Sequence, residues 1–306
     1  MKSTLRHYAP VALLLAVILA AVSCLSLLTK GEPDPRPQVL ATTHPLYVAT
    51  QYILGSTDEV RLTTLSGTGA GCLHDYQLSP ADRLALERAQ VILQNGAGPE
   101  PFLEGVDPTR LVNTSEGLDL LCTDHHHEGG DHHEKEAHNE HVWVSPTRYQ
   151  KQVLAVMNTL IALDGGNEAA YRNNAENYLR HIDYVWSQMQ ATSLSGRPCV
   201  LFQDSLAYLA EDLGLDVQMV LTFDGDSGLS AEDLAHVERL AKEHPDLLLM
   251  YDTQYPIRYG AVDGLVPPEQ VISLETAVVG DGTPTDWLDA MTRNAETLQK
   301  LGGDAP

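Results

Sequence analysis

Short apolar runs alternate with segments of helical pattern along most of this 306-residue chain, and this alternation restricts the fold more than any other feature. Runs such as 90–94 (QVILQ) and 247–251 (LLLMY) are uncharged, which is typical of strands buried on both faces. Strand–helix–strand order favours parallel sheets, because parallel strands need a crossover that is usually a helix. The sequence therefore predicts an α/β fold with helices on both faces of mostly parallel sheets.

The alternation occurs in two blocks. The expected strands are 38–43, 59–65, 90–94 and 110–113 in the first block, and 198–202, 216–221, 247–251 and 271–274 in the second. The expected helices of these blocks are 45–54, one opened by Ser79-Pro80, 205–213, 231–244 with Ser230 as its cap, and 285–301.

A different pattern separates the blocks. From Ser145-Pro146 the apolar residues recur at helical spacing as far as Gly165-Gly166, and Asn167 can then cap a second helix that runs to about Gln190. Roughly 45 residues of helix with one break are too long for a standard strand–helix unit. We therefore expect two Rossmann-like (β/α) lobes with parallel sheets, joined by a long rigid helix.

These patterns predict a division of the chain into segments. The predicted segments are 1–30 as a signal or anchor, 31–37 as a spacer, 38–145 as an N-terminal lobe with a histidine-rich loop at 122–141, 146–192 as linking helices, and 193–306 as a C-terminal lobe.

The N-terminus has the pattern of a targeting or anchoring segment. Lys2 and Arg6 precede residues 10–28, which carry no charge and are about long enough to span a bilayer as a helix. Cys24 follows Ala21-Val22-Ser23, which resembles a lipoprotein cleavage site. We expect an extracytoplasmic protein that is anchored to the cell membrane by a lipid on Cys24 or by the uncleaved helix. Secretion after removal of the segment is the alternative.

Residues 122–146 contain seven of the thirteen histidines, mixed with aspartate and glutamate. Imidazole is the commonest side-chain ligand of zinc and related cations, and carboxylates add oxygen donors. The segment has no apolar periodicity, so it is predicted to be an exposed loop that attracts metal ions. A purification tag or a soluble linker is the alternative, although tags usually stand at a terminus.

The charge of the chain limits its partners. Nineteen lysines and arginines against 42 aspartates and glutamates leave a formal net charge of −23. Such a chain repels nucleic acid and anionic membrane surfaces, and it attracts cations. A Cys72–Cys122 disulfide is conceivable, whereas Cys199 lies in an apolar run and is expected to be a buried thiol.

Polar side chains follow several of the expected strands. His74 and His141 belong to the first block, and the second block offers Gln203-Asp204, Asp252, Asp281 and Asp286. Ligands of α/β sheets bind beyond the carboxyl ends of the strands. Two imidazoles opposite several oxygen donors therefore favour a metal site between the lobes.

Three segments carry a family resemblance. Residues 71–80 (GCLHDYQLSP), 94–102 (QNGAGPEPF) and 141–146 (HVWVSP) resemble the metal-binding solute receptors of zinc and manganese ABC importers. The resemblance extends over most of 38–301. It implies two (β/α) lobes bridged by a rigid helix, a monomer without enzymatic activity, and Zn²⁺ or Mn²⁺ as the transported ligand. It also implies an ABC importer membrane permease as the partner, and no nucleic acid.

The resemblance also implies a set of metal ligands. His74 and His141 match the first two family ligands, Gln203 stands where the family has His or Glu, and Asp281, with Asp286 as the alternate, matches the fourth. A glutamine carbonyl is a weak zinc ligand, so Gln203 departs from the pattern. Asp204 or Cys72 could compensate for it.

Imidazoles and the histidine-rich loop favour zinc, whereas the oxygen donors favour manganese. Three alternatives therefore remain beside a zinc receptor: a manganese receptor, a degenerate paralogue that binds metal weakly, and a zinc-dependent hydrolase. The hydrolase has the least support, because the chain contains no HExxH motif, nucleophile elbow or phosphate-binding loop.

Overall fold

The computed structural model describes residues 34–65, 76–98, 100–122, 138–221, 229–253 and 264–302, together with Val17, Leu19 and Val262. Residues 1–36 and 37–306 form two separate compact units, and the fold below is that of the second. Among the described residues no helix is both long and apolar enough to cross a membrane. Apart from Val17 and Leu19, the predicted anchor at 10–28 and Cys24 lie outside the described residues.

The second unit contains two sheets of four parallel strands each. The first has the order β2 (Arg61–Thr64), β1 (Gln38–Ala41), β3 (Val91–Gln94) and β4 (Leu111–Asn113). The second has the order β6 (Asp216–Val220), β5 (Pro198–Leu201), β7 (Leu248–Asp252) and β8 (Val271–Leu274). The predicted α/β fold with parallel sheets is confirmed, and each expected strand is present with its ends shifted by no more than a few residues.

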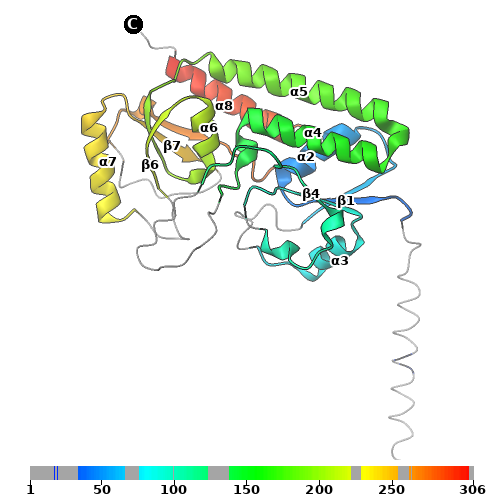
Figure 1. The fold of residues 1–306 in the computed structure, drawn as a ribbon. Helices are drawn as coiled ribbons and strands as arrows, with labels where there is room; N and C mark the ends of the chain where they lie inside the picture. The colour runs from blue at the N-terminus through cyan, green and yellow to red at the C-terminus, as the bar shows by residue number, and fades with distance from the viewer. Residues whose placement is uncertain are drawn as a thin grey trace, which may run out of the picture. The chain divides into compact units, whose positions relative to one another are not determined.

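Helices connect and cover the sheets (Figure 1). The α-helices are α2 (His44–Leu54), α3 (Pro80–Arg88), α4 (Pro146–Leu163), α5 (Glu168–Gln190), α6 (Ala207–Asp212), α7 (Ala231–Glu243) and α8 (Asp286–Gly302). The short 3₁₀ helices are η2 (Pro101–Leu103), η3 (Pro108–Arg110), η4 (Val142–Val144), η5 (Gly165–Asn167), η6 (Asp204–Leu206) and η8 (Pro268–Gln270).

Serine caps fix the starts of several helices. The hydroxyl oxygens of Ser79 and Ser230 each accept a hydrogen bond from the backbone three residues on, with the reciprocal aspartate bond of a capping box. The predicted cap at Asn167 is only half correct. Asn167 stands at the N-cap of α5, but its side chain does not cap the helix and donates instead to Asp164 Oδ2 at 2.7 Å.

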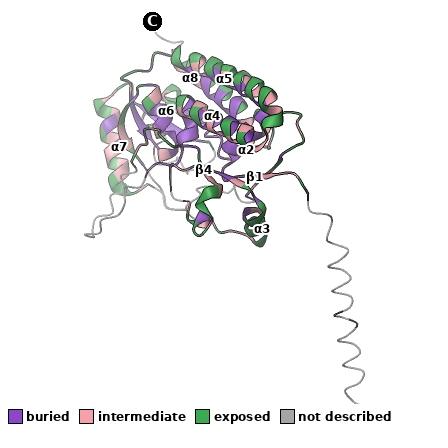
Figure 2. Ribbon diagram, turned by 45° about the vertical axis from the view of Figure 1, so that its right-hand side comes forward, coloured by how far each residue is buried: buried purple, intermediate pink, exposed green. Residues whose placement is uncertain are grey.

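The helices α4 and α5 occupy the predicted connector between the two sheets. In α5 the buried residues are spaced three and four apart, which gives the helix one apolar face: Tyr171, Ala175, Tyr178, Ile182, Val185 and Met189. This face packs against α2, α4 and α8, so one helix contacts elements of both halves (Figure 1). Figure 2 shows α5 exposed on its outer side and buried toward these neighbours.

The largest hydrophobic cluster of the described residues runs through both halves, and each half also has a smaller cluster of its own. Trp143 Nε1 donates to the Thr276 carbonyl at 2.8 Å, and Trp287 Nε1 donates to the Trp143 carbonyl at 2.9 Å. The Trp287 ring stacks on Tyr149, with ring centroids 4.3 Å apart. The two sheets are therefore joined by packed side chains as well as by helices. The exact limits of the lobes stay a prediction.

The two described cysteines differ in environment. Cys199 is buried in β5, as expected, and burial raises the pKa of its thiol to about 12. Cys122 is exposed and its thiol is free, so no Cys72–Cys122 disulfide forms in this structure. Cys72 itself lies outside the described residues. A buried thiol with a raised pKa is a poor nucleophile and a poor metal ligand.

Candidate metal site

Both sheets have the same strand order. In each, the second strand is added on one side of the first strand, and the third and fourth strands are added on the opposite side. The reversal lies between β1 and β3 in the first sheet and between β5 and β7 in the second. Ligands of open α/β sheets bind at such a switch point, beyond the carboxyl ends of the strands. The carboxyl ends of these four strands are therefore the natural place for a binding site. Asp252 is the last residue of β7, Gln203 lies just after β5, and His44 begins the helix that follows β1.

The structure shows what each residue of the motif His141–Pro146 contacts. Val142 and Val144 are fully buried, and Trp143 reaches the Thr276 carbonyl beyond β8. The Ser145 hydroxyl accepts from Arg148 N and starts α4, in which Pro146 is the first residue. Each residue after His141 thus anchors the segment, so His141 is held at a defined place, with 4% of its surface exposed.

His141 is oriented by a neighbour two residues before it. Asn139 Oδ1 lies 2.9 Å from the His141 backbone nitrogen and 3.1 Å from the ring nitrogen Nδ1. The ring also meets Trp143 edge-on, with centroids 5.4 Å apart. The Asn95 side chain at the end of β3 donates to the Glu140 carbonyl at 2.7 Å and supports the same turn from the first sheet.

Gln203 and Asp204 follow β5 and lie close to this turn. Asn139 Nδ2 donates to the Asp204 carbonyl at 2.7 Å, and Asp204 Oδ1 lies 3.9 Å from His141 Nδ1. Gln203 is half-buried, and within the described part of the chain its side chain makes no hydrogen bond. The structure therefore places two predicted site residues, His141 and Gln203, on segments that touch.

The carboxylate of Asp252 supports the turn that carries Gln203. Asp252, at the end of β7, is 0% exposed. Its Oδ2 accepts hydrogen bonds from Ser205 Oγ at 3.0 Å and from Thr276 Oγ1 at 2.8 Å. Because Ser205 is two residues from Gln203, these bonds fix the turn that carries Gln203.

Asp281 and Asp286 lie in a cluster with a histidine that the sequence analysis did not select. His44 Nε2 is 3.1 Å from Asp286 Oδ2, and Gly282 N and Thr283 Oγ1 also donate to the Asp286 carboxylate. A side chain on Gly280 would collide with both His44 and Asp286, so the pair is tightly enclosed.

The charges of this cluster influence one another. Burial lowers the pKa of His44, and the neighbouring Asp286 carboxylate opposes this effect. A hydrogen bond with Asp286 is the largest cause of the lowered pKa of Asp281, which is exposed. The Asp286 oxygens are already occupied by donors, whereas the exposed Asp281 carboxylate is the more accessible of the two.

His74 lies outside the described residues, as does Asp75. Two residues beyond His74, Tyr76 is anchored: its hydroxyl donates to Asp82 Oδ2 at 2.7 Å, and its ring meets Phe102 edge-on. Of the described residues, no three His, Cys, Asp or Glu side chains are grouped so as to hold a metal ion. The described part of the predicted site is thus one imidazole, one amide and nearby carboxylates.

Comparison with known proteins identifies the family. The family model described as ZnuA, zinc-uptake complex component A, periplasmic, matches residues 39–301. This range includes both sheets and every predicted ligand. The chain belongs to this family. It is a metal-binding solute receptor of the zinc and manganese ABC-importer type, and this membership gives the hydrolase alternative no support.

Individual relatives are distant but consistent with the ZnuA family. The high-affinity zinc uptake system protein ZnuA of Bacillus subtilis is 25% identical over 245 residues, which cover 75% of this chain and 76% of that protein. The zinc-binding lipoprotein AdcA of Streptococcus pneumoniae is 26% identical over 76% of this chain, which spans only 48% of AdcA. The manganese-binding lipoprotein MntA of Halalkalibacterium halodurans is 22% identical over 74% of this chain and 76% of MntA.

Solved structures share the fold. FpvC of Pseudomonas aeruginosa in complex with Mn²⁺ superposes with a TM-score of 0.72 at 20% identity, covering 89% of this chain and 100% of FpvC. A crystal structure of ZnuA gives 0.68 at 21% identity, covering 88% and 100% of the two chains. These matches confirm the two-sheet architecture of this ZnuA-family chain.

The sequence analysis missed His44 and Asn139. His44 directly follows the expected strand 38–43, and the rule that selected polar residues after strands would have found it. Asn139 carries no such signal, because its role depends on contacts with Asp204 and Tyr208, 65 and 69 residues away.

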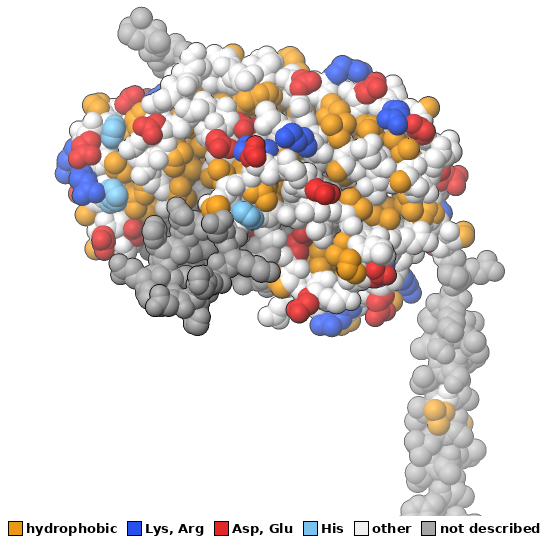
Figure 3. Space-filling model, in the orientation of Figure 1, with side chains coloured by type: hydrophobic (Ala, Val, Ile, Leu, Met, Phe, Trp, Pro, Cys, Tyr) orange, Lys and Arg blue, Asp and Glu red, His pale blue; other side chains and the backbone are white. Residues whose placement is uncertain are grey.

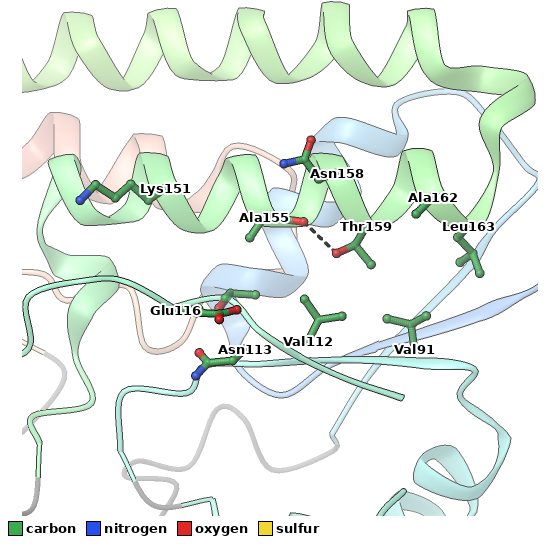
Figure 4. A pocket seen from close by; sticks show the side chains of 11 residues that line it. Val91, Val112, Asn113, Glu116, Lys151, Ala155, Asn158, Thr159, Ala162 and Leu163 are labelled. Atoms are coloured by element: carbon green, nitrogen blue, oxygen red, sulfur yellow. Dashed lines mark hydrogen bonds between the residues drawn. The ribbon is translucent and has the colours of Figure 1, made fainter. Parts of the chain in front are cut away.

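One groove among the described residues lies away from the predicted metal ligands. It has a volume of about 630 Å³ and lies between α4 and the strands β3 and β4, with Val91, Val112 and Leu163 among its aliphatic lining (Figure 4). None of the predicted metal ligands lines it. On the face drawn in Figure 3, acidic and basic side chains are interspersed over the helices without one large patch of either sign.

Proposed function

We propose that this protein captures Zn²⁺ outside the cytoplasm and delivers it, as a monomer, to the membrane permease of an ABC importer. The proposed ligands are His74, His141, Gln203 and Asp281, with Asp286 as the alternate. Zinc is the expected ligand because two imidazoles and a histidine-rich loop favour it over manganese. Because the proposed ligands are two nitrogen and two oxygen donors, the preference for zinc over manganese is modest. A manganese receptor is the second candidate, because relatives in this family include a manganese-binding protein.

The observation that carries this proposal is the geometry of His141. A histidine that binds a metal ion offers the lone pair of one ring nitrogen. Its other ring nitrogen is usually engaged by a hydrogen bond that fixes the tautomer. His141 is buried, and its Nδ1 is engaged by Asn139 Oδ1 at 3.1 Å. This arrangement supports Nε2 as the ligating atom, beside the turn of the second sheet that carries Gln203.

Location follows from the same family. Relatives are described as lipoproteins, which supports an anchored protein. We therefore propose an extracytoplasmic protein attached to the cell membrane, either by a lipid on Cys24 or by an uncleaved N-terminal helix. Incorporation of a radiolabelled fatty acid into the wild type but not into Cys24→Ala distinguishes the two anchors.

The first prediction concerns the histidine-rich segment. In the soluble part from Gly31, deletion of 123–137 should remove several weak zinc sites and leave one tight site. Cys122 and His138 form an antiparallel bridge that holds the turn before His141, so a short Gly-Ser linker takes the place of the deleted residues and lets these two residues stay paired. Calorimetric titration of both proteins measures the number and affinity of sites. Loss of the tight site on deletion would show that the loop itself holds the tightly bound ion.

The second prediction concerns Gln203. Gln203→His should tighten zinc binding by about 10-fold or more, because a second-sheet imidazole replaces a weak amide oxygen. The gain should be larger at pH 8 than at pH 6, since imidazole must be neutral to bind metal. Competition with a chelator measures it in the loop-deleted protein.

Asp204→Ala and Cys72→Ser are the matched variants for Gln203→His. If either weakens zinc binding while Gln203→His changes nothing, the position is already filled by another donor and the proposed ligand set is wrong. If the wild type binds zinc only weakly and Gln203→His restores tight binding, the chain is the degenerate paralogue.

A further inference from the structure

The side chain of Asn139 lies between the two segments that carry His141 and Gln203. It is 2% exposed and makes three hydrogen bonds. Its Oδ1 faces the backbone nitrogen and the ring Nδ1 of His141, and its Nδ2 faces the backbone carbonyl of Asp204.

Two of these contacts fix the orientation of the amide. A backbone N–H can only donate, so the atom that it faces must be the amide oxygen. A backbone carbonyl can only accept, so the atom that faces Asp204 must be the amide nitrogen. Both requirements are met by the same orientation. The amide oxygen therefore also faces the ring of His141. Because this oxygen accepts a hydrogen bond from Nδ1, Nδ1 must carry the hydrogen.

The tautomer of His141 follows from this. A neutral imidazole carries one hydrogen, so a donor at Nδ1 leaves the lone pair on Nε2. The carboxylate of Asp204 is also near Nδ1, but at 3.9 Å it is beyond hydrogen-bond distance. The amide of Asn139 is thus the group that orients the ring.

The backbone of Asn139 is held as firmly as its side chain. Its N–H donates to the Leu121 carbonyl at 2.8 Å, and its carbonyl accepts from the Tyr208 hydroxyl at 2.8 Å. Tyr208 belongs to α6 in the second half, and Leu121 precedes the bridge of Cys122 with His138. Asn139 is therefore fixed relative to both halves, and it transmits that position to His141.

We propose that Asn139 is the positioning residue of the metal site. It holds His141 in the tautomer that presents Nε2 to the ion, and through Asp204 it sets the spacing between His141 and the Gln203 turn. The role in metal binding rests on the function proposed above, whereas the tautomer is a property of the metal-free protein.

The test compares Asn139→Ala with Asn139→Asp. In loop-deleted protein with ¹⁵N-labelled histidine at pH 8, the ring nitrogens of His141, assigned by their absence in His141→Ala, should show the Nδ1–H tautomer. Asn139→Ala should shift the ring to a mixture of tautomers and raise the zinc dissociation constant about 10–100-fold. Asn139→Asp keeps an acceptor and should keep the tautomer, while losing the bond to Asp204.

Asn294→Ala is the matched control. Asn294 is 1% exposed, and its amide likewise accepts from a backbone N–H and donates to a backbone carbonyl, both of Glu275. It should lose stability and leave both the His141 tautomer and the zinc constant unchanged.

An unchanged tautomer in Asn139→Ala, or a lost one in Asn139→Asp, would overturn the proposal. If Asn139→Ala does not fold, Asn139→Asp alone decides. Absence of zinc binding in the wild type would instead refute the proposed function, and the tautomer measurement would still judge the role of Asn139.

Discussion

Replacing His141 with alanine should abolish tight zinc binding. Loss of an outer partner of a metal ligand already weakens binding about 10–100-fold, so loss of the ligand itself should exceed about 100-fold. The buried position of His141 means that no exposed side chain can easily take its place. Chelator competition in the loop-deleted protein measures the change, and His74→Ala should have an effect of the same size.

His181→Ala is the control for this experiment. His181 is exposed on α5, where its Nδ1 lies 3.3 Å from the Tyr52 hydroxyl, and its removal should leave zinc binding unchanged. Unchanged zinc affinity in His141→Ala would refute a metal site at His141. If His44→Ala alone then reduced binding, the ion would belong with Asp286 and Asp281 instead.

The alternation of strands and helices was sufficient to predict the fold. The uncharged run 247–251 (LLLMY) is typical of a parallel strand buried on both faces, and all of β7 is buried. The spacing of buried residues in Glu168–Gln190 likewise fixes a helix with one apolar face. Ser79 and Ser230 mark helix starts because a hydroxyl can satisfy a free backbone donor there. These signals are local and can be read from the sequence.

The contacts between distant segments could not be read in this way. His44 pairs with Asp286 across 242 residues, and Trp143 meets Thr276 across 133. Periodicity identifies which face of an element is apolar, but it does not identify the partner of that face. The sequence predicted two lobes with a connector. The structure adds that the largest apolar cluster continues through the connector into both halves, while each half also has a smaller cluster of its own.

The same limit applies to the candidate site. The position of His141 at the start of a motif made it a candidate, but its tautomer depends on an amide that is itself oriented by Asp204. The sequence predicted Asp281 as the fourth ligand, with Asp286 as the alternate. It could not show that His44, Gly282 and Thr283 contact the Asp286 carboxylate, because His44 is distant in the sequence.

Trp287 packs where the two halves meet, and this contact region is called the joint below. Trp287→Ala should lower the free energy of unfolding by about 3–5 kcal/mol, because it removes a fully buried aromatic ring. It also removes the stacking on Tyr149 and leaves the Trp143 carbonyl without its indole donor. Urea unfolding followed by circular dichroism measures the loss. Trp186→Ala, on the half-buried side of α5, is the control and should cost less.

Trp287→Phe separates packing from hydrogen bonding at this joint. Phenylalanine keeps much of the ring but cannot donate, so about 1–3 kcal/mol should remain as the cost of the orphaned carbonyl. Because Trp143 is two residues from His141, loosening of this carbonyl should also weaken zinc binding in Trp287→Ala. If stability falls but the zinc constant does not change, the His141 turn is held by Asn139 and Asn95 alone, and the joint has no part in metal binding.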